Sequence, residues 1–141
     1  MTIIERFAAA FNQGDVPGLV ALFSEDASYT DTFFCEHAGH PKLRAMFERM
    51  FHEGRDYAWV MDSVVATPER VAAEWTFRYT VTDAVPRSAG RHVGFRGMSF
   101  FELEGGKIAR YREVFDVGTA LLQLGFSAEA IAKVLRRLAV E

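Results

Sequence analysis

The sequence lacks several features that would assign a class of function at once. It has a single cysteine in 141 residues, so no disulfide can form within the chain, which suits a reducing compartment. It has no excess of positive charge, since 16 basic and 19 acidic residues leave a formal net charge of -3, and we expect no nucleic-acid partner. It also lacks an apolar run long enough to cross a bilayer, and its first residues lack the charge order of a signal peptide. We therefore expect a cytoplasmic protein with no membrane partner.

Apolar and aromatic side chains are abundant. Hydrophobic residues make up 50% of the chain, and 13 residues are phenylalanine. A chain of this size and composition can bury a complete core, and it shows no internal repeat, low-complexity tract or linker. We predict one domain over residues 1–141.

The first third of the chain predicts three helices. Apolar residues recur at helical spacing up to Phe11, and Gly14 suits the left-handed cap that ends such a helix. Asp15 suits the N-cap of a second helix. A third helix is predicted over residues 40–53, after a β-strand that contains Asp31.

The next part of the chain predicts four strands, joined as three successive hairpins over residues 57–116. The second of these strands alternates in polarity, which places Val71, Ala73, Trp75, Phe77, Tyr79 and Val81 on one face. We predict an α+β fold in which the helices cover this face of an antiparallel sheet, followed by a C-terminal helical tail with Ser127 as an N-cap.

This order of elements resembles the nuclear-transport-factor-2-like superfamily. The motifs that carry the resemblance are "FNQGDVPGLVALFSEDASYTD", Gly39 ahead of the third helix, and "GMSFFELEGGKIARYREVFD". The tail "FDVGTALLQLG" is similar to the polyketide-cyclase (SnoaL-like) branch. The resemblance implies a cystatin-like α+β cone, with a strongly curved antiparallel sheet, helices over its concave face, a pocket for a small molecule, and a homodimer.

Asp31 matches the position of the general base in ketosteroid isomerases. Tyr29 and Phe33 share its strand face, so an inward-facing Asp31 would lose solvent and its pKa would rise. The alternative is that Asp31 ends the strand in water or binds backbone amides of the next loop. The positions that match the isomerases' oxyanion donors hold Phe7 and Met98, which cannot donate, so steroid isomerisation is not expected.

Asp116 matches the acid that the cyclases use as a general acid and base. On its strand it shares a face with Arg112, which could pair with it. The alternative is an N-cap, because Asp116 directly precedes the tail helix. The two roles are compatible.

His37 lies in the segment "CEHAGH", which we interpret as a loop. The segment lacks the paired, distant ligands of a structural zinc site, and we expect neither a metal nor another cofactor. His37 stays a candidate proton shuttle, since an unperturbed histidine titrates near neutral pH.

These observations support two hypotheses. The first is a small cofactor-independent enzyme that binds an apolar cyclic carbonyl compound and transfers protons through Asp31, Asp116 or His37, in a cyclase-, isomerase- or dehydratase-like reaction. The residues expected to contact the ligand are Tyr29, Phe33, Phe47, Met50, Trp75, Met98 and Arg112. The second is a non-catalytic ligand-binding or homodimerisation module in which apolar side chains fill the cone.

Overall fold

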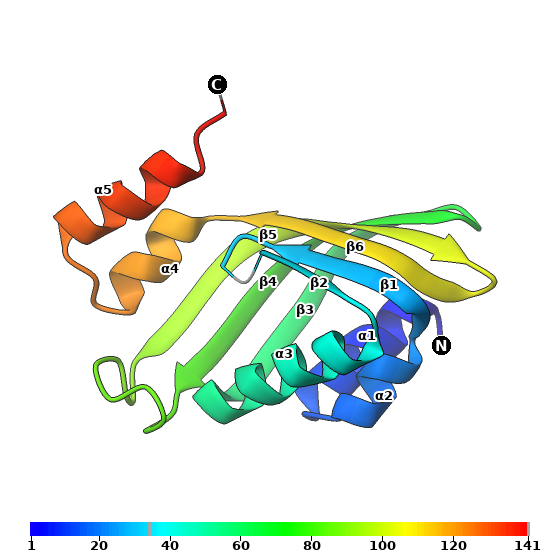
Figure 1. The fold of residues 1–141 in the computed structure, drawn as a ribbon, viewed down its shortest axis with the longest axis horizontal. Helices are drawn as coiled ribbons and strands as arrows, with labels where there is room; N and C mark the ends of the chain where they lie inside the picture. Colours follow the sequence, from blue (N-terminus) through cyan, green and yellow to red (C-terminus); the bar gives the residue numbers. More distant parts are fainter. Residues whose placement is uncertain (34, 141) are drawn as a thin grey trace.

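The computed structural model describes residues 1–33 and 35–140, and it is an α+β structure built on a strongly curved, unclosed sheet (Figure 1). The helices are α1 (Ile3–Asn12), α2 (Val16–Ala21), α3 (His40–Glu53), α4 (Val117–Gln123) and α5 (Ala128–Arg137). The strands are β1 (Phe23–Asp31), β2 (Cys35–Ala38), β3 (Gly54–Ala66), β4 (Arg70–Val81), β5 (His92–Glu104) and β6 (Lys107–Phe115). The predicted fold class is confirmed.

The helices begin and end where local chemistry predicts. Gly14 takes a positive φ of 66° just after α1, and the Asp15 side chain caps α2 by accepting from the Gly18 amide at 3.0 Å. Ser127 caps α5 by accepting from the Ala130 amide at 3.2 Å. Among the described residues, no helix is long and apolar enough to cross a membrane.

The strands lie side by side in the order β2-β1-β6-β5-β4-β3. The three hairpins β3-β4, β4-β5 and β5-β6 are antiparallel, as predicted. Two features were not predicted: β1 pairs with β6 in parallel, and residues 35–38, which we interpreted as loop, form the short edge strand β2.

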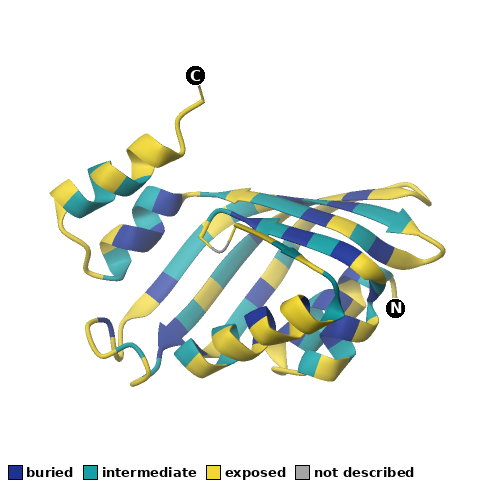
Figure 2. Cartoon of the chain, viewed as in Figure 1, coloured by how far each residue is buried: buried dark blue, intermediate teal, exposed yellow. Residues whose placement is uncertain are grey.

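The core lies between the concave face of the sheet and helices α1, α2 and α3 (Figures 1 and 2). Phe7 and Phe11 of α1 are buried against Trp59 of β3, with ring centroids 5.1 and 4.9 Å from it. The alternating residues of β4 face this core, and Trp75 is 1% exposed. At the other end, α4 packs on β5, and α5 packs on α4 with no buried residue of its own. The helices thus cover only part of the concave face.

Candidate functional site

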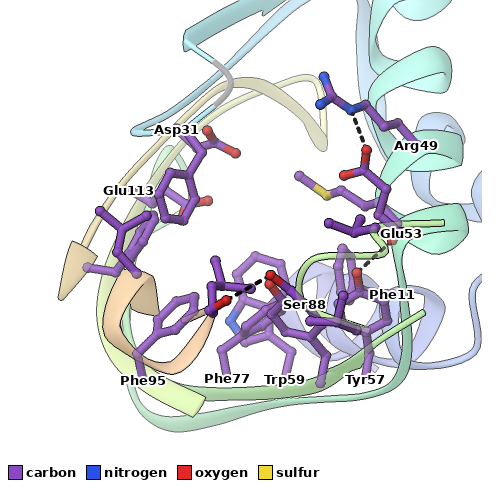
Figure 3. Close-up of a pocket in the computed structure, with 18 of the residues that line it drawn as sticks. Phe11, Asp31, Arg49, Glu53, Tyr57, Trp59, Phe77, Ser88, Phe95 and Glu113 are labelled. Atoms are coloured by element: carbon purple, nitrogen blue, oxygen red, sulfur yellow. Dashed lines mark hydrogen bonds and ion pairs between the residues drawn. The ribbon is translucent and has the colours of Figure 1, made fainter. Parts of the chain in front are cut away.

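A cavity of about 360 Å³ lies on the concave side of the sheet, a size typical of small-molecule sites. Helices α1 and α3 form one wall, the sheet forms another, and the loop after β4 and the end of α4 close the far side. Most of the lining is aromatic and includes Phe11, Tyr57, Trp59, Trp75, Phe77 and Phe95 (Figure 3). Such walls favour flat apolar ligands.

Two carboxyl groups, those of Asp31 and Glu113, interrupt this apolar lining, and Figure 3 shows them together on one side of the cavity. They come from the adjacent parallel strands β1 and β6, in which Tyr29 is paired with Tyr111. The same order of tyrosine, acid and phenylalanine at every second residue occurs twice, as Tyr29-Asp31-Phe33 at the end of β1 and just beyond it, and as Tyr111-Glu113-Phe115 within β6. The parallel register therefore places each residue of one triplet beside its counterpart in the other.

The ring contacts between the triplets agree with this register. Tyr29 stacks on Tyr111 with ring centroids 4.1 Å apart, and Phe33 contacts Phe115 at 5.1 Å. These two aromatic pairs enclose the carboxyl groups from both ends of the triplets. Asp31 is consequently only 7% exposed.

Glu113 is held by two hydrogen bonds on one oxygen. The hydroxyls of Tyr29 and Tyr111 both donate to Oε1, at 3.1 and 3.0 Å. Tyr111 is in turn bonded to Ser99 Oγ at 2.6 Å, and Trp75 Nε1 donates to Ser99 Oγ at 2.7 Å. Glu113 therefore rests on a polar network that extends into the core.

The surroundings keep a proton on Glu113. Burial first, and then the negative charge of Asp31, raise the pKa of Glu113, and the two tyrosine hydrogen bonds offset only part of the change, so that the pKa is about 8. Burial also raises the pKa of both tyrosines well above its ordinary value, so they stay protonated donors. At neutral pH the site thus holds a neutral Glu113 beside the charge of Asp31.

The opposite side of the cavity carries a second polar pair. Arg49 and Glu53 of α3 form an ion pair with 3.0 Å between Nε and Oε1, across the cavity from the acids (Figure 3). At the far end, Ser88 Oγ donates to the Leu124 carbonyl at 2.8 Å, which ties the loop after β4 to the end of α4. These contacts shape the rim of the cavity. The charges of Arg49 and Glu53 offset each other, so the pair adds no net charge to the cavity.

Five of the predicted site residues line this cavity: Tyr29, Asp31, Phe33, Met50 and Trp75. Of the two interpretations of Asp31, the structure has the one in which the side chain faces an apolar cavity. The acid beside Asp31 is Glu113, which was not among the predicted site residues.

Three predicted ligand contacts lie elsewhere, and these placements correct the prediction. Phe47 is 0% exposed within the core beneath the cavity. Met98 is 55% exposed on the outer face of the sheet, and Arg112 lies on that face too, with its guanidinium 5.0 Å from the Phe100 ring centroid. On β5 and β6 the outward and inward faces alternate, and these residues occupy the outward positions. The outer face stays available for the predicted homodimer, which remains a prediction.

Two predicted catalytic residues also lie outside the described cavity lining. Asp116 is exposed and caps α4, accepting from the Thr119 amide at 3.0 Å and from its hydroxyl at 2.6 Å. These bonds lower the pKa of Asp116. His37 lies on β2, where it is paired with Tyr29 across the strands. Asp116 thus serves as a helix cap, and the proposed proton-shuttle role of His37 stays a prediction.

Glu113 is the residue that sequence reasoning missed. The sequence pattern led us to assign the functional face of its strand from Arg112 and Asp116, but Arg112 lies on the outer face and Asp116 caps the next helix. The signal that could have found Glu113 is the repeated triplet, because an acid between two inward aromatics occurs at both 29–33 and 111–115.

Residues 4–111 of this chain match the family model described as "SnoaL-like domain". The chain belongs to the SnoaL-like family. The matched region of this SnoaL-like domain includes Asp31, whereas Glu113 lies two residues beyond its end. The predicted membership of the nuclear-transport-factor-2-like superfamily is thereby confirmed.

Solved structures share the fold of this SnoaL-like chain. A protein with a ketosteroid isomerase-like fold from Catenulispora acidiphila is 17% identical and superposes with a TM-score of 0.79, covering 92% of this chain and 98% of its own. A candidate polyketide cyclase from Silicibacter sp. TM1040 is 28% identical, with a TM-score of 0.74 and coverages of 89% and 93%. An LEH-like epoxide hydrolase from M. tuberculosis is 20% identical, with a TM-score of 0.72 and coverages of 97% of this chain and 94% of its own.

Proposed function

We propose that this protein is a cofactor-independent enzyme that transfers protons next to the carbonyl group of an uncharged, ring-containing apolar molecule. The observation that carries the proposal is the pairing of Asp31 with Glu113 at one side of an aromatic cavity. Two carboxyl groups whose surroundings separate their protonation states can serve as base and acid at one pH. The candidate polyketide cyclase among the structural neighbours is compatible with such a reaction.

The proposed reaction divides the two proton transfers between the acids. The Asp31 carboxylate accepts a proton from the carbon next to the carbonyl, and the C–H electron pair forms the double bond of an enol. Glu113 gives its proton to the carbonyl oxygen in the same step. When the enol collapses, Asp31 returns a proton to carbon and the oxygen-bound proton returns to Glu113. Atoms and charges balance, and no cofactor is required.

The cavity also supports a substrate class. Its aromatic walls stabilise flat rings by contact, and its volume of about 360 Å³ suits a compound of two or three rings. A substrate carboxylate beside the Asp31 charge would be repelled in an environment of low polarity. We therefore expect uncharged ketones to bind and their carboxylated analogues to be excluded.

Deuterium exchange at the carbon next to the carbonyl tests the proposal without knowledge of the natural product. The probes are 1-indanone, 1-tetralone and 2-tetralone in deuterated buffer at neutral pH, followed by proton NMR, with a carboxylated tetralone as the anionic comparison. We expect the wild-type protein to accelerate exchange of at least one ketone, and Asp31→Asn and Glu113→Gln each to lower that rate about 100-fold or more.

The matched control is Asp116→Asn, which alters a carboxylate of the same chain outside the cavity. It should exchange the ketone at the wild-type rate. Saturable binding of the ketones with no accelerated exchange would contradict the enzymatic proposal and favour the ligand-binding module.

A further inference from the structure

A line of hydrogen bonds runs from Glu113 away from the cavity into the core. It passes from Tyr111 to Ser99 and ends at Trp75, with donor–acceptor distances of 3.0, 2.6 and 2.7 Å. Ser99 is 3% exposed, Trp75 is 1% exposed and Tyr111 is fully buried. A chain this deep in the core is insulated from bulk water, so its members must satisfy one another.

The chemistry of the indole group fixes the direction of this chain. An indole N–H can only donate, so Ser99 Oγ accepts from Trp75. Among the described residues the Tyr111 hydroxyl is the one other hydrogen-bond partner of Ser99 Oγ, so the buried serine hydrogen is satisfied only if it is donated to Tyr111. The single hydrogen of the Tyr111 hydroxyl is then directed to Oε1 of Glu113. The Tyr29 hydroxyl donates to the same oxygen.

We propose that Trp75 and Ser99 are positioning residues that fix both tyrosine hydrogens on Oε1 and thereby confine the exchangeable proton of Glu113 to Oε2. In the reverse direction, Glu113 would donate from Oε1 to Tyr111, and its proton would point into the core rather than stay available for transfer. The inference rests on the proposed function for its catalytic meaning. Its test needs no substrate, so the two can fail separately.

The hydrogen-bond chain from Trp75 to Glu113 carries no charge of its own and acts by orienting hydroxyl hydrogens. Other groups set the electric field at Glu113. Asp31 and Tyr29 face Glu113 from β1, Tyr111 lies on its own strand, and the Arg49–Glu53 ion pair lies across the cavity on α3. A substitution at Trp75 or Ser99 replaces none of these residues, and within the described part of the chain the only one of them that is hydrogen-bonded to either position is Tyr111, through Ser99. A change in the C=O stretching frequency or the pKa of Glu113 in such a variant therefore reports the direction of these hydrogen bonds.

The structure offers a matched pair of tryptophan variants. Trp59 is also buried, lines the same cavity and contacts Trp75 with ring centroids 5.3 Å apart. Its Nε1 has no hydrogen-bond partner among the described residues. Trp75→Phe removes the donor that fixes the chain, whereas Trp59→Phe removes a similar ring without removing such a bond.

The readout is the infrared C=O stretch of protonated Glu113, isolated by subtracting the spectrum of Glu113→Gln at about pH 6.5, above the ordinary pKa of a glutamate. In the wild-type protein Oε1 is the carbonyl oxygen and accepts two hydrogen bonds, which lowers the stretching frequency. In Trp75→Phe the reversed direction becomes accessible, so we expect a shift to higher wavenumber and a rise of about one unit in the pKa of Glu113. Trp59→Phe should match the wild type.

Ser99→Ala provides a second variant with a smaller change in volume, and it should shift the band in the same direction. An unshifted band in both Trp75→Phe and Ser99→Ala would overturn the inference while leaving the acid pair intact. An equal shift in Trp59→Phe would also overturn it, because packing would then be the cause. No protonated Glu113 in the wild type would overturn both the inference and the proposed acid.

Discussion

Tyr29 and Tyr111 stack with ring centroids 4.1 Å apart and planes 18° from parallel, and both hydroxyls donate to the same oxygen of Glu113. The stack follows from the parallel pairing of β1 with β6, which puts the two tyrosines in register. Because Asp31 and Glu113 follow two residues later on the same face, the same pairing creates the acid pair. The position of Glu113 is therefore set by sheet register as well as by side-chain packing.

Removing either tyrosine hydroxyl should raise the pKa of Glu113 above about 8, since each hydrogen bond stabilises the ionised form. We expect Tyr29→Phe and Tyr111→Phe each to raise it by about one unit, measured by ¹³C NMR of labelled glutamate. Tyr57→Phe is the control, because that hydroxyl donates to the Met50 carbonyl at 2.6 Å and not to the acids. An unchanged pKa of Glu113 in both Tyr29→Phe and Tyr111→Phe would contradict the hydrogen-bond assignment.

Glu113 should make stability depend on pH. Its pKa is about 8 in the folded state against an ordinary 4.5, so between these values the folded state holds a proton that the unfolded state releases. The contribution to stability is present below pH 4.5 and is lost as the pH rises toward 8, at up to about 1.4 kcal/mol per pH unit. Urea unfolding across this range measures it.

Glu113→Gln keeps the shape of the side chain and removes the titration. The difference in free energy of unfolding between wild type and variant should therefore carry the slope described above. A difference that stays constant from pH 4.5 to 8 would show that Glu113 titrates normally.

Asp116 should matter for stability and not for proton transfer. Asp116→Ala removes the cap of α4, and we expect a loss of about 1 kcal/mol in the free energy of unfolding. Asp116→Ser, which retains a capping oxygen, should recover most of the loss. Thermal unfolding measures both, and a large loss of ketone exchange in Asp116→Ala would contradict this assignment.

Gly97 should not tolerate a side chain. A Cβ there would lie 2.6 Å from Trp75 Cζ2 and from the Val114 carbonyl oxygen, and the ring cannot move without breaking its bond to Ser99. We expect Gly97→Ala to destabilise the fold by about 1–3 kcal/mol in chemical unfolding. Gly118→Ala is the control, because its nearest neighbour lies at 3.8 Å, and it should leave stability unchanged or higher.

The local elements were predictable because their signals are local. Gly14, Asp15 and Ser127 fix helix ends through chemistry within a few residues, and the alternation around Trp75 fixes the inward face of β4. The hairpins β3-β4 and β5-β6 follow from short turns at residues 67–69 and 105–106. These features required no knowledge of distant contacts.

The site was less predictable because it depends on a distant pairing. Tyr29 and Tyr111 are adjacent only through the parallel contact of β1 with β6, which neither strand's own pattern specifies. The inward face of β6 was also misassigned, since the expected pairing of Arg112 with Asp116 selected the alternate positions of that strand and passed over Glu113. Asp31 could be identified from the pattern of its own strand. Glu113 could be identified as its neighbour only from the register of β1 with β6.

The central claim is that Glu113 holds a proton at neutral pH beside the charge of Asp31. A ¹³C NMR titration of carboxyl-labelled glutamate, with Glu113→Gln for assignment, measures this in the wild type and in Asp31→Asn. We expect a midpoint of about 8 in the wild type and a lower one in Asp31→Asn, because the negative charge of Asp31 raises the pKa of Glu113. Midpoints near the ordinary 4.5 in both proteins would contradict it.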